Sequence, residues 1–310
     1  MTKRLAVVIN PTAGGGRAIT IGRDLREQLH AAGHELVDVS GASALEAKVQ
    51  LEALLAADRS LDAVIAVGGD GLVNLAASAV VGTQIPLAII PAGTGDDIAR
   101  GIGIDRRSHR DIAALVRVLA QPELPVRAID VGQVSSDNDA EVPRYFFSVL
   151  TAGLDAEVNA RANRMRFGRG KLRYVAALVA QLRHYRSYDY EIRVDGRVIR
   201  RQVILAAVAN LRFFGGGMRI APQARPDDGR FQLVLVDRVS LPVLLWIFPR
   251  IFWGGHVKHR AVQVMVADRV ELRRTSHTFT PAPFADGEPI VNPPLRCEVR
   301  PGALQIIKLG

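Results

Sequence analysis

The sequence predicts an N-terminal doubly wound α/β domain followed by a mainly antiparallel β-sandwich domain that carries a helical insertion. Up to Leu119, uninterrupted apolar runs alternate with helical segments, which is typical of a parallel sheet buried on both faces. Later segments have mixed polarity and are separated by Asp-Gly turn signals, which indicates an antiparallel sheet. The 310 residues are also long for one compact core. We therefore expect the α/β domain over residues 1–125 and 297–310 and the sandwich over residues 126–296.

Each element of the first domain follows from a local pattern. Short apolar runs predict strands over residues 4–10, 35–39, 63–67 and 86–91. The segments between and after them predict helices over residues 17–32, 43–57, 72–81, 98–100 and 108–119. Ser43 is the expected N-cap of its helix, because its hydroxyl can accept a hydrogen bond from an N–H group of the first turn.

The second domain reads as short strands joined by turns. The expected strands span residues 128–134, 144–150, 190–194, 203–210, 231–236 and 261–266. A helical pattern over about residues 157–186 interrupts them, so we expect an insertion there.

Composition limits the protein class. Hydrophobic residues make up 48% and charged residues 23% of the chain, which is typical of a soluble globular protein. The apolar runs Leu5–Ile9 and Leu241–Phe248 are too short for a signal-peptide core or a membrane span, so we expect a cytoplasmic location. The single cysteine, Cys297, excludes an internal disulfide framework and is predicted to be a small buried strand residue.

Positive charge is concentrated in one part of the chain. The net charge is +9, but residues 151–260 hold 20 Lys and Arg against 8 Asp and Glu. A basic half joined to a near-neutral half indicates a polyanionic partner, either an anionic membrane surface or a nucleic acid.

The turn Gly68-Gly69-Asp70-Gly71 is the motif on which the functional prediction depends. It joins a strand predicted to be fully buried to a helix N-terminus, where glycines let backbone N–H groups approach a phosphate. The Asp70 carboxylate would repel a bare phosphate, so it suggests a magnesium ion between the two. The alternative is an ordinary strand-to-helix turn with a solvated Asp70.

Two common nucleotide-binding patterns are absent from the sequence. Gly170-Lys171 is followed by Leu172, so no P-loop signature occurs. Gly93-Thr94-Gly95 does not continue as Gly-x-Gly-x-x-Gly either, so an ordinary dinucleotide-binding dehydrogenase is not indicated.

Five motifs in order resemble the soluble bacterial diacylglycerol kinases, relatives of the eukaryotic lipid and sphingosine kinases, and the overall pattern is similar to actinobacterial members. Together they cover nearly the whole chain. They are Asn10-Pro11-Thr12-Ala13-Gly14, Gly68 to Gly71, Pro91 to Arg100, Ala221 to Gly229, and Asp286-Gly287-Glu288-Pro289.

The resemblance implies ATP and Mg²⁺ as cofactors and assigns roles to individual residues. The ATP contacts would come from Asn10, Pro11, Thr12, Ala13, Gly14, Ser40, Gly69, Asp70, Gly71, Leu72, Val73, Asn74, Leu75 and Thr94. The carboxylates that organise the nucleotide's magnesium would be Asp70, Asp97 and, through water, Asp130. A second, structural magnesium would be bound by Asp228 and the backbone carbonyls of Arg225 and Arg230. Glu288 would be the general base, with Asp286 beside it.

The chemistry supports Glu288 independently of the resemblance. Phosphoryl transfer to an alcohol needs a base within hydrogen-bond reach of the hydroxyl group. Asp286-Gly287-Glu288 puts two carboxylates on a turn whose glycine permits close approach. The alternative is a surface β-turn, since Asp-Gly is a general turn signal, and the same alternative applies to Asp227-Asp228-Gly229.

The chain departs from the family pattern in the nucleotide loops. Leu72 stands where a threonine is usual, and Asp96 replaces an asparagine. Ala13 replaces a common serine. Gly15 stands where some members have a lysine, so Arg17 is the expected source of a cation there.

Two basic stretches suggest how the protein would reach a lipid. Residues 161–173 hold six cations and no acid, and residues 244–260 set Trp246 and Trp253 beside a basic cluster. Apolar and aromatic groups backed by cations suit an anionic membrane surface. The alternative is that the apolar faces pack on the sandwich. His184, His256 and His259 are expected on the surface.

We therefore predict a lipid kinase, a phosphotransferase with an alcohol acceptor, that converts diacylglycerol to phosphatidic acid at the inner face of the membrane. Kinases of a sphingosine-like alcohol or of NAD, which also use Gly-Gly-Asp-Gly, remain alternatives. A non-enzymatic basic module is a third hypothesis, but no nucleic-acid motif supports binding of DNA or RNA. The resemblance also implies that a homodimer can form.

Overall fold

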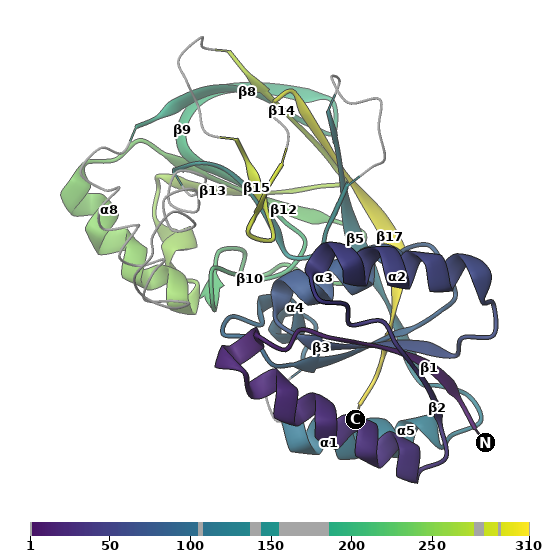
Figure 1. The fold of residues 1–310 in the computed structure, drawn as a ribbon. Helices are drawn as coiled ribbons and strands as arrows, with labels where there is room; N and C mark the ends of the chain where they lie inside the picture. Colours follow the sequence, from purple (N-terminus) through teal and green to yellow (C-terminus); the bar gives the residue numbers. More distant parts are fainter. Residues whose placement is uncertain are drawn as a thin grey trace. The chain divides into compact units, whose positions relative to one another are not determined.

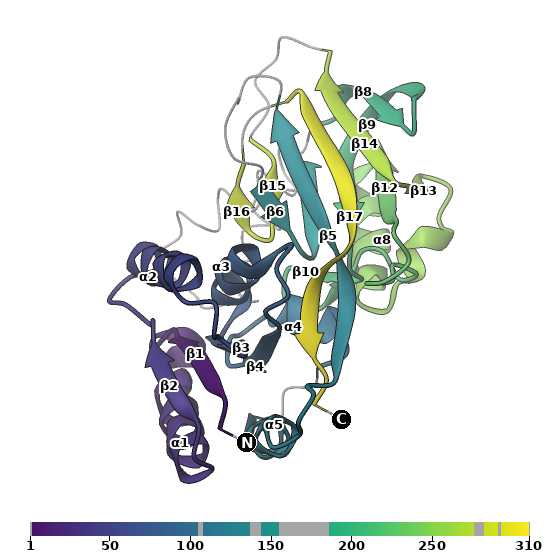
Figure 2. The ribbon, with the colours of Figure 1, turned by 90° about the vertical axis from the view of Figure 1, so that its right-hand side faces the viewer.

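The computed structural model describes residues 2–104, 108–136, 144–154, 186–275, 282–290 and 293–309. The chain forms two compact units. Unit 1 comprises Met1–Ile129 and Gly302–Gly310, and unit 2 comprises Asp130–Pro301. The chain passes from one unit to the other within β5 (Val126–Ser136) and β17 (Leu295–Ile307), two strands that pair with each other (Figure 2).

Unit 1 is a parallel sheet of β1 (Arg4–Ile9), β2 (Glu35–Asp38), β3 (Ala63–Gly68), β4 (Leu87–Pro91) and the C-terminal end of β17. The strand order is β2-β1-β3-β4-β17, and every pair is parallel. β3 and β4 are buried at every residue, which explains why their sequences have no polar alternation.

Helices cover both faces of this sheet. They are α1 (Arg17–Ala31), α2 (Ala44–Ala57), α3 (Asp70–Val80), α4 (Asp97–Gly101) and α5 (Ser108–Leu119). α1 and α5 lie on one face, and α2 and α3 lie on the other (Figure 1). Ser43 is the N-cap of α2 as predicted, because its side chain accepts the N–H of Glu46. The predicted doubly wound fold is therefore confirmed.

The order of the strands places a topological switch point at β1 and β3. From β1 the chain goes to one side through β2, and it later returns to the other side through β3. Sheets of this class bind ligands at the carboxyl ends of the strands that flank such a point. The loops after β1 and β3 are the glycine-containing segments that the sequence analysis singled out.

Unit 2 is mainly antiparallel. Its longer strands are β5, β7 (Val149–Gly153), β8 (Tyr188–Val194), β9 (Arg197–Ala209), β12 (Phe231–Asp237), β13 (Val262–Ala267), β14 (Arg269–Arg274) and β17. Short strands are β6 (Arg144–Phe146), β10 (Phe213–Phe214), β11 (Met218–Arg219), β15 (Phe284–Ala285) and β16 (Glu288–Pro289). The helical segments are α8 (Leu241–Ile247), η2 (Phe248–Trp253) and η3 (Gly255–Lys258).

Strand β12 is buried on both faces. Phe231, Leu233 and Leu235 pack with Tyr190 in one apolar cluster, while Val234 contributes to a second cluster. The second cluster includes Leu244 of α8 and Ile251 of η2, so these segments cover one face of the sheet. The antiparallel sheet of unit 2 is therefore packed with apolar side chains on both faces of β12.

Several element boundaries differ from the prediction. The expected strand over residues 144–150 is divided into β6 and β7. β14 and the short strands other than β6 were not predicted, and β17 was anticipated only through Cys297. The expected insertion over residues 157–186 lies almost wholly outside the described residues. Cys297 is fully buried in β17, as predicted.

We expect Gly132→Ala to destabilise unit 2 by about 1–3 kcal/mol, the usual cost of forcing atoms into a packed core. A Cβ atom at Gly132 in β5 would lie 2.3 Å from the ring of Phe146, which is fully buried and stacked on Phe231. Urea unfolding followed by tryptophan fluorescence measures the effect, because Trp246 and Trp253 both belong to unit 2.

A matched pair identifies the cause. Phe146→Leu should cost less stability in the Gly132→Ala background than in the wild type, because the smaller side chain relieves the overlap. Equal urea midpoints for Gly132→Ala and the wild type would contradict the proposed overlap.

Candidate functional site

Three loops at the carboxyl ends of β1, β3 and β4 make the candidate nucleotide site of unit 1. An added Cβ atom at Gly93 would lie 2.5 Å from the Cα atom of Gly69, and one at Gly14 would lie 2.3 Å from the carbonyl oxygen of Ala92. Real Cβ atoms do not tolerate such distances. The three loops therefore come this close only because glycine occupies these positions.

The N-terminus of α3 faces open space. Gly69 is the N-cap, so no side chain there bonds the N–H groups of the first turn. An added Cβ atom at Gly71 would meet no atom within 4 Å. The positive end of the helix dipole favours an anion, so a phosphate fits this position.

Asp70 ties this turn to α4. The helix begins two residues earlier than predicted, so Gly69 alone lies between β3 and Asp70. The Oδ1 atom of Asp70 accepts the N–H of Ile98 at 2.9 Å. A carboxylate in the first turn is also stabilised by the helix dipole. Asp70 therefore fixes the spacing of the β3 and β4 loops, and its predicted role toward magnesium remains a prediction.

The loop after β4 is held by its own acidic residues. Asp96 is 2% exposed, and its Oδ1 accepts the N–H of Gly93 at 2.9 Å. Asp97 begins α4 and pairs with Arg100 at 3.0 Å. Thr94 lies exposed at the tip of the loop. The Asp96 that departs from the family pattern thus has a structural role here.

The loop after β1 is ordered by Asn10. Its Oδ1 accepts the N–H and the hydroxyl of Thr12 at 3.0 and 2.8 Å. Arg17 donates to the carbonyl oxygen of Gly93 at 3.2 Å, which places its guanidinium against the β4 loop. Ser40 accepts the N–H of Ile9 and donates to Asp38, so it fixes the end of β1.

Other predicted nucleotide residues point partly into the core. Leu72 and Val73 are buried, so their side chains do not face a ligand and only their main chain could contact one. Leu72 packs over Gly68, where a Cβ atom would meet it at 2.7 Å. Asn74 accepts the hydroxyl of Ser78 at 3.4 Å. Leu72 therefore replaces a possible nucleotide contact with core packing.

In unit 2, Asp130 holds the segment that carries Asp228. Its Oδ2 accepts the N–H of Gly229 at 2.6 Å, and its own N–H donates to the carbonyl oxygen of Pro226 at 2.7 Å. Asp228 is exposed, and its Oδ1 accepts the N–H of Arg230 at 3.2 Å. Asp130 thus shapes the loop, and Asp228 is presented by it.

The predicted magnesium ligands near Asp228 are all oxygen atoms, one from a carboxylate and two from the carbonyls of Arg225 and Arg230. Oxygen donors of this kind fit Mg²⁺, which retains several waters when a protein supplies few ligands. No group of three or more His, Cys, Asp or Glu in the described ranges could hold a metal ion. A cation at Asp228 would therefore depend on carbonyl oxygens and water.

Asn210 supports the same region and was not identified from the sequence. It is fully buried at the end of β9, and its Nδ2 donates to the carbonyl oxygens of Asp130 and Phe147 at 2.9 and 3.0 Å. The sequence feature that could have identified Asn210 is a polar residue at the end of an apolar strand. Its partners lie 80 and 63 residues away, so the sequence could not name them.

The Asp286-Glu288 motif forms a two-residue hairpin between β15 and β16. Asp286 and Gly287 have φ values of 49° and 87°, as two-residue turns of this kind require. The Asp286 carboxylate accepts the N–H groups of Phe147, Ser148 and Val149 at 2.7, 2.9 and 3.1 Å. Glu288 pairs with Ala285 and is exposed. Asp286 therefore fixes the hairpin, and Glu288 is presented on it.

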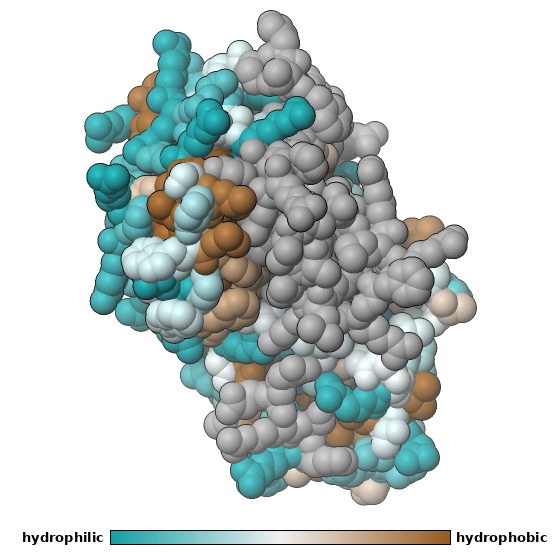
Figure 3. All heavy atoms as spheres, turned by 90° about the vertical axis from the view of Figure 1, so that its left-hand side faces the viewer, coloured by the Kyte–Doolittle hydropathy of each residue, from teal (hydrophilic) through white to brown (hydrophobic). Residues whose placement is uncertain are grey.

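A surface segment of unit 2, from Leu241 to Trp253, exposes apolar side chains. Figure 3 shows apolar residues (brown) gathered on the side that carries α8, close to hydrophilic residues (teal). The large hydrophobic side chains exposed over α8 and η2, which include two tryptophans, are Leu241, Leu245, Trp246, Phe252 and Trp253. We call these five side chains the α8–η2 face.

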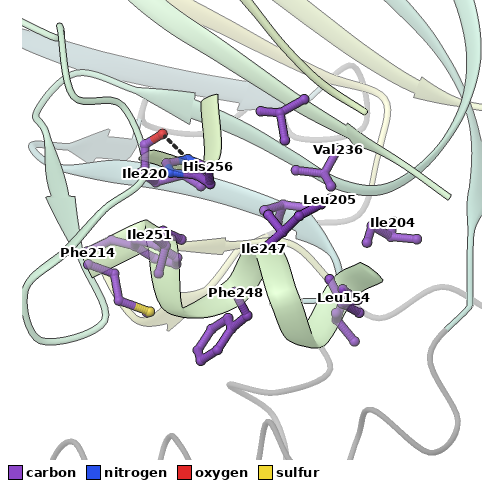
Figure 4. Close-up of a pocket in the computed structure, with 13 residues that line it drawn as sticks. Leu154, Ile204, Leu205, Phe214, Ile220, Val236, Ile247, Phe248, Ile251 and His256 are labelled. Atoms are coloured by element: carbon purple, nitrogen blue, oxygen red, sulfur yellow. Dashed lines mark hydrogen bonds between the residues drawn. The ribbon is translucent and has the colours of Figure 1, made fainter. Parts of the chain in front are cut away.

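Behind the α8–η2 face lies an apolar cavity of about 80 Å³ (Figure 4). Its walls include Leu154 and Ile204 from the sheet side and Ile247, Phe248 and Ile251 from α8 and η2. This is roughly half of the about 150 Å³ that hold benzene, so the cavity has room for only a few methylene groups at the end of a hydrocarbon chain.

His256 lines this cavity, and its predicted surface position is wrong. It is 2% exposed, and its Nε2 donates to the carbonyl oxygen of Ile220 at 3.0 Å. Burial lowers the pKa of the imidazole, so the ring is neutral. The neighbouring cations suggested a surface residue, but η3 turns the ring inward.

The chain matches two family models. The model described as "Diacylglycerol kinase catalytic domain" matches residues 4–134, and the one described as "YegS C-terminal NAD kinase beta sandwich-like domain" matches residues 148–308. The curated "Diacylglycerol kinase" of Mycobacterium tuberculosis is 34% identical over 310 residues, which covers 98% of this chain and 95% of that protein. The "Diacylglycerol kinase" of Bacillus subtilis is 26% identical over 87% of this chain and 86% of that protein.

Solved structures share the fold. A diacylglycerol kinase from Bacillus anthracis strain Sterne superposes with a TM-score of 0.71 at 18% identity, covering 98% of this chain and 96% of that one. Yeast NADH kinase complexed with NADH gives a TM-score of 0.53 at 10% identity, covering 98% and 82%. With the catalytic-domain match and 34% identity along nearly the whole length, the chain belongs to the diacylglycerol kinase family.

Proposed function

We propose that this lipid kinase transfers the γ-phosphoryl group of ATP to the free hydroxyl of diacylglycerol and releases phosphatidic acid and ADP. The bond between the γ-phosphorus and the bridging oxygen breaks, a bond from the lipid oxygen to that phosphorus forms, and the hydroxyl proton passes to a base. The observation that carries the proposal is the open α3 N-terminus beside three loops in glycine-to-backbone contact.

The phosphates of ATP would lie against the first turn of α3. The proposed contacts are main-chain N–H groups between Gly69 and Leu75, the exposed Thr94, and the loop from Asn10 to Gly14 with Ser40 at its base. Arg17 reaches the same loops and would add positive charge. Fixed donors at a helix N-terminus bind a polyphosphate without reorganising.

Asp70 and Asp97 are the proposed carboxylates for the magnesium that accompanies ATP. Each is the first residue of a helix, and the Asp70–Ile98 hydrogen bond holds the two helix starts together. Magnesium would supply neutralisation of the charge on the transferred group. Asp130 would join this magnesium network through water, and it also holds the loop that carries Asp228.

Glu288 is the proposed base. Its side chain is exposed, and the hairpin that carries it is anchored through Asp286 by three hydrogen bonds. A base must lie within hydrogen-bond reach of the hydroxyl whose proton it accepts.

The apolar cavity supports a lipid as the acceptor in preference to NAD. Its described walls are apolar apart from His256, and a hydrocarbon chain gains free energy by leaving water for such a site. A dinucleotide would need polar partners there. We therefore place the activity at the cytoplasmic face of an anionic membrane, where the lipid is held. No helix within the described residues is long and apolar enough to cross a membrane.

Labelled ATP offered with diacylglycerol, sphingosine or NAD in mixed micelles tests the acceptor, and we expect labelled phosphatidic acid. Glu288→Gln should lower kcat by roughly 10²–10⁴-fold, the usual contribution of general-base catalysis, with little change in the KM for ATP. The control is Glu123→Gln, an exposed glutamate of unit 1 outside the site. Labelled NADP as the sole product, or unchanged turnover by Glu288→Gln, would contradict the assignment.

Asp286 should affect stability, unlike Glu288. Asp286→Ala leaves three N–H groups without their acceptor and puts alanine at a positive φ, so we expect a loss of about 2 kcal/mol or more. Asp286→Asn keeps one acceptor oxygen and tolerates this backbone conformation, so its stability should lie between that of Asp286→Ala and that of the wild type. Thermal unfolding measures the series. A melting temperature for Asp286→Ala equal to that of the wild type would argue against the anchoring role.

Magnesium should stabilise nucleotide-free protein through Asp228. Added Mg²⁺ raises the melting temperature by mass action if it binds the folded state, and Asp228→Asn should lose most of that rise. Asp227→Asn is the matched control, because Asp227 is the adjacent carboxylate and pairs with Arg225 at 3.6 Å. An equal magnesium-induced rise in melting temperature in both variants would contradict the proposed site at Asp228.

A further inference from the structure

The segment from Leu241 to Trp253, which carries the α8–η2 face, has apolar side chains on its buried side as well as on its exposed side. Leu244, Ile247 and Ile251 point into unit 2 and are buried. Trp246 is 54% and Trp253 is 61% exposed on the outside. Eleven large hydrophobic residues are exposed in the described part of the chain, and five of them lie within the thirteen residues of α8 and η2. A cluster of this kind marks an interaction surface.

The surroundings of this face are basic. Residues 238–260 contain four cations and no acid, namely Arg238, Arg250, Lys258 and Arg260. The guanidinium of Arg250 lies 3.3 Å above the Trp246 ring, and His259 meets the same ring edge-on at 6.0 Å. Asp237, the acid next to this stretch, is paired with Arg201 at 2.8 Å. The positive charge around the aromatic side chains is therefore not neutralised from within residues 238–260.

This charge distribution argues against a second copy of the chain as the partner. In a two-fold symmetric dimer the same patch meets itself, so the cations of one copy would face those of the other. Like charges brought together in an interface weaken it. An anionic bilayer satisfies both features, because aromatic rings reside at the headgroup level and lysines and arginines reach the lipid phosphates.

We propose that the α8–η2 face is the membrane-docking surface, with Trp246, Phe252 and Trp253 entering the interfacial layer of an anionic bilayer. Arg250, Lys258 and Arg260 bind the lipid phosphates around them. The docking rests on the proposed function in one respect, since that function requires a substrate held in the bilayer.

The two tryptophans of the chain both belong to this face, so tryptophan fluorescence, excited selectively, reports on it alone. Nucleotide-free protein is titrated with phosphatidylcholine vesicles, with and without phosphatidylglycerol. We expect a blue shift with the anionic vesicles, quenching by lipids brominated in the acyl chain, and weaker binding at high salt. Absence of both the shift and the quenching would overturn the docking proposal.

Variants separate the apolar from the ionic contribution in vesicle co-sedimentation. Leu245→Ser with Phe252→Ser should weaken binding at least 10-fold. Ile19→Ser with Val49→Ser, which removes apolar side chains of unit 1 that are at least as exposed, should bind like the wild type. Lys258→Gln with Arg260→Gln should lower the affinity about 5-fold for each cation removed and only for anionic vesicles. Equal loss in the unit 1 control would contradict a specific face.

A kinase assay distinguishes failure of the docking from failure of the proposed function. With a short-chain, water-soluble diacylglycerol, Leu245→Ser with Phe252→Ser should retain wild-type turnover, and it should lose turnover only on diacylglycerol in vesicles. Equal turnover of the variant and the wild type on vesicles would overturn the docking. Fluorescence shifts without phosphorylation of any diacylglycerol would overturn the function and leave the docking supported. A wild-type dimer in light scattering that this double variant dissociates would identify a second copy as the partner and overturn the membrane assignment.

Discussion

The close approach of Gly69 and Gly93 is the constraint on which the nucleotide side of this protein depends. Parallel strands β3 and β4 bring their carboxyl ends together, but two ordinary residues would hold the following loops apart by the width of their side chains. With glycine at both positions the loops touch. The hydrogen bond from Ile98 to Asp70 can then form, and the first turn of α3 is left open on its other side.

The acidic motifs of unit 2 combine an anchor with a presented group. Asp286 accepts three N–H groups, and Glu288 two residues later is exposed. Asp130 plays the anchoring part for the exposed Asp228 from a distant point in the sequence. Carboxylate oxygens that already accept main-chain N–H groups have fewer lone pairs left for a substrate or a metal ion. The geometry therefore favours the exposed partner of each pair for chemistry.

Sequence patterns identify what is local and miss what is not. Five consecutive apolar residues sufficed to predict β3 because burial on both faces leaves no polar alternation. β14 was not predicted from the sequence because four of its six residues are charged and only Val270 and Leu272 are buried. The inward turn of His256 depends on Ile220, 36 residues away, and the break between β6 and β7 coincides with N–H groups that bond Asp286, about 138 residues later. Contacts of that range leave no periodic signal.

The comparison with yeast NADH kinase shows that the fold alone does not select the acceptor. Both proteins share the architecture at a TM-score of 0.53, and the identity of 10% carries no statement about substrate. The lipid assignment must therefore rest on features added to the fold. In unit 2 this feature is the segment of α8 and η2. One side of the segment lines an apolar cavity, and the other side exposes aromatic side chains. One short segment therefore contributes to both the cavity wall and the exposed aromatic face.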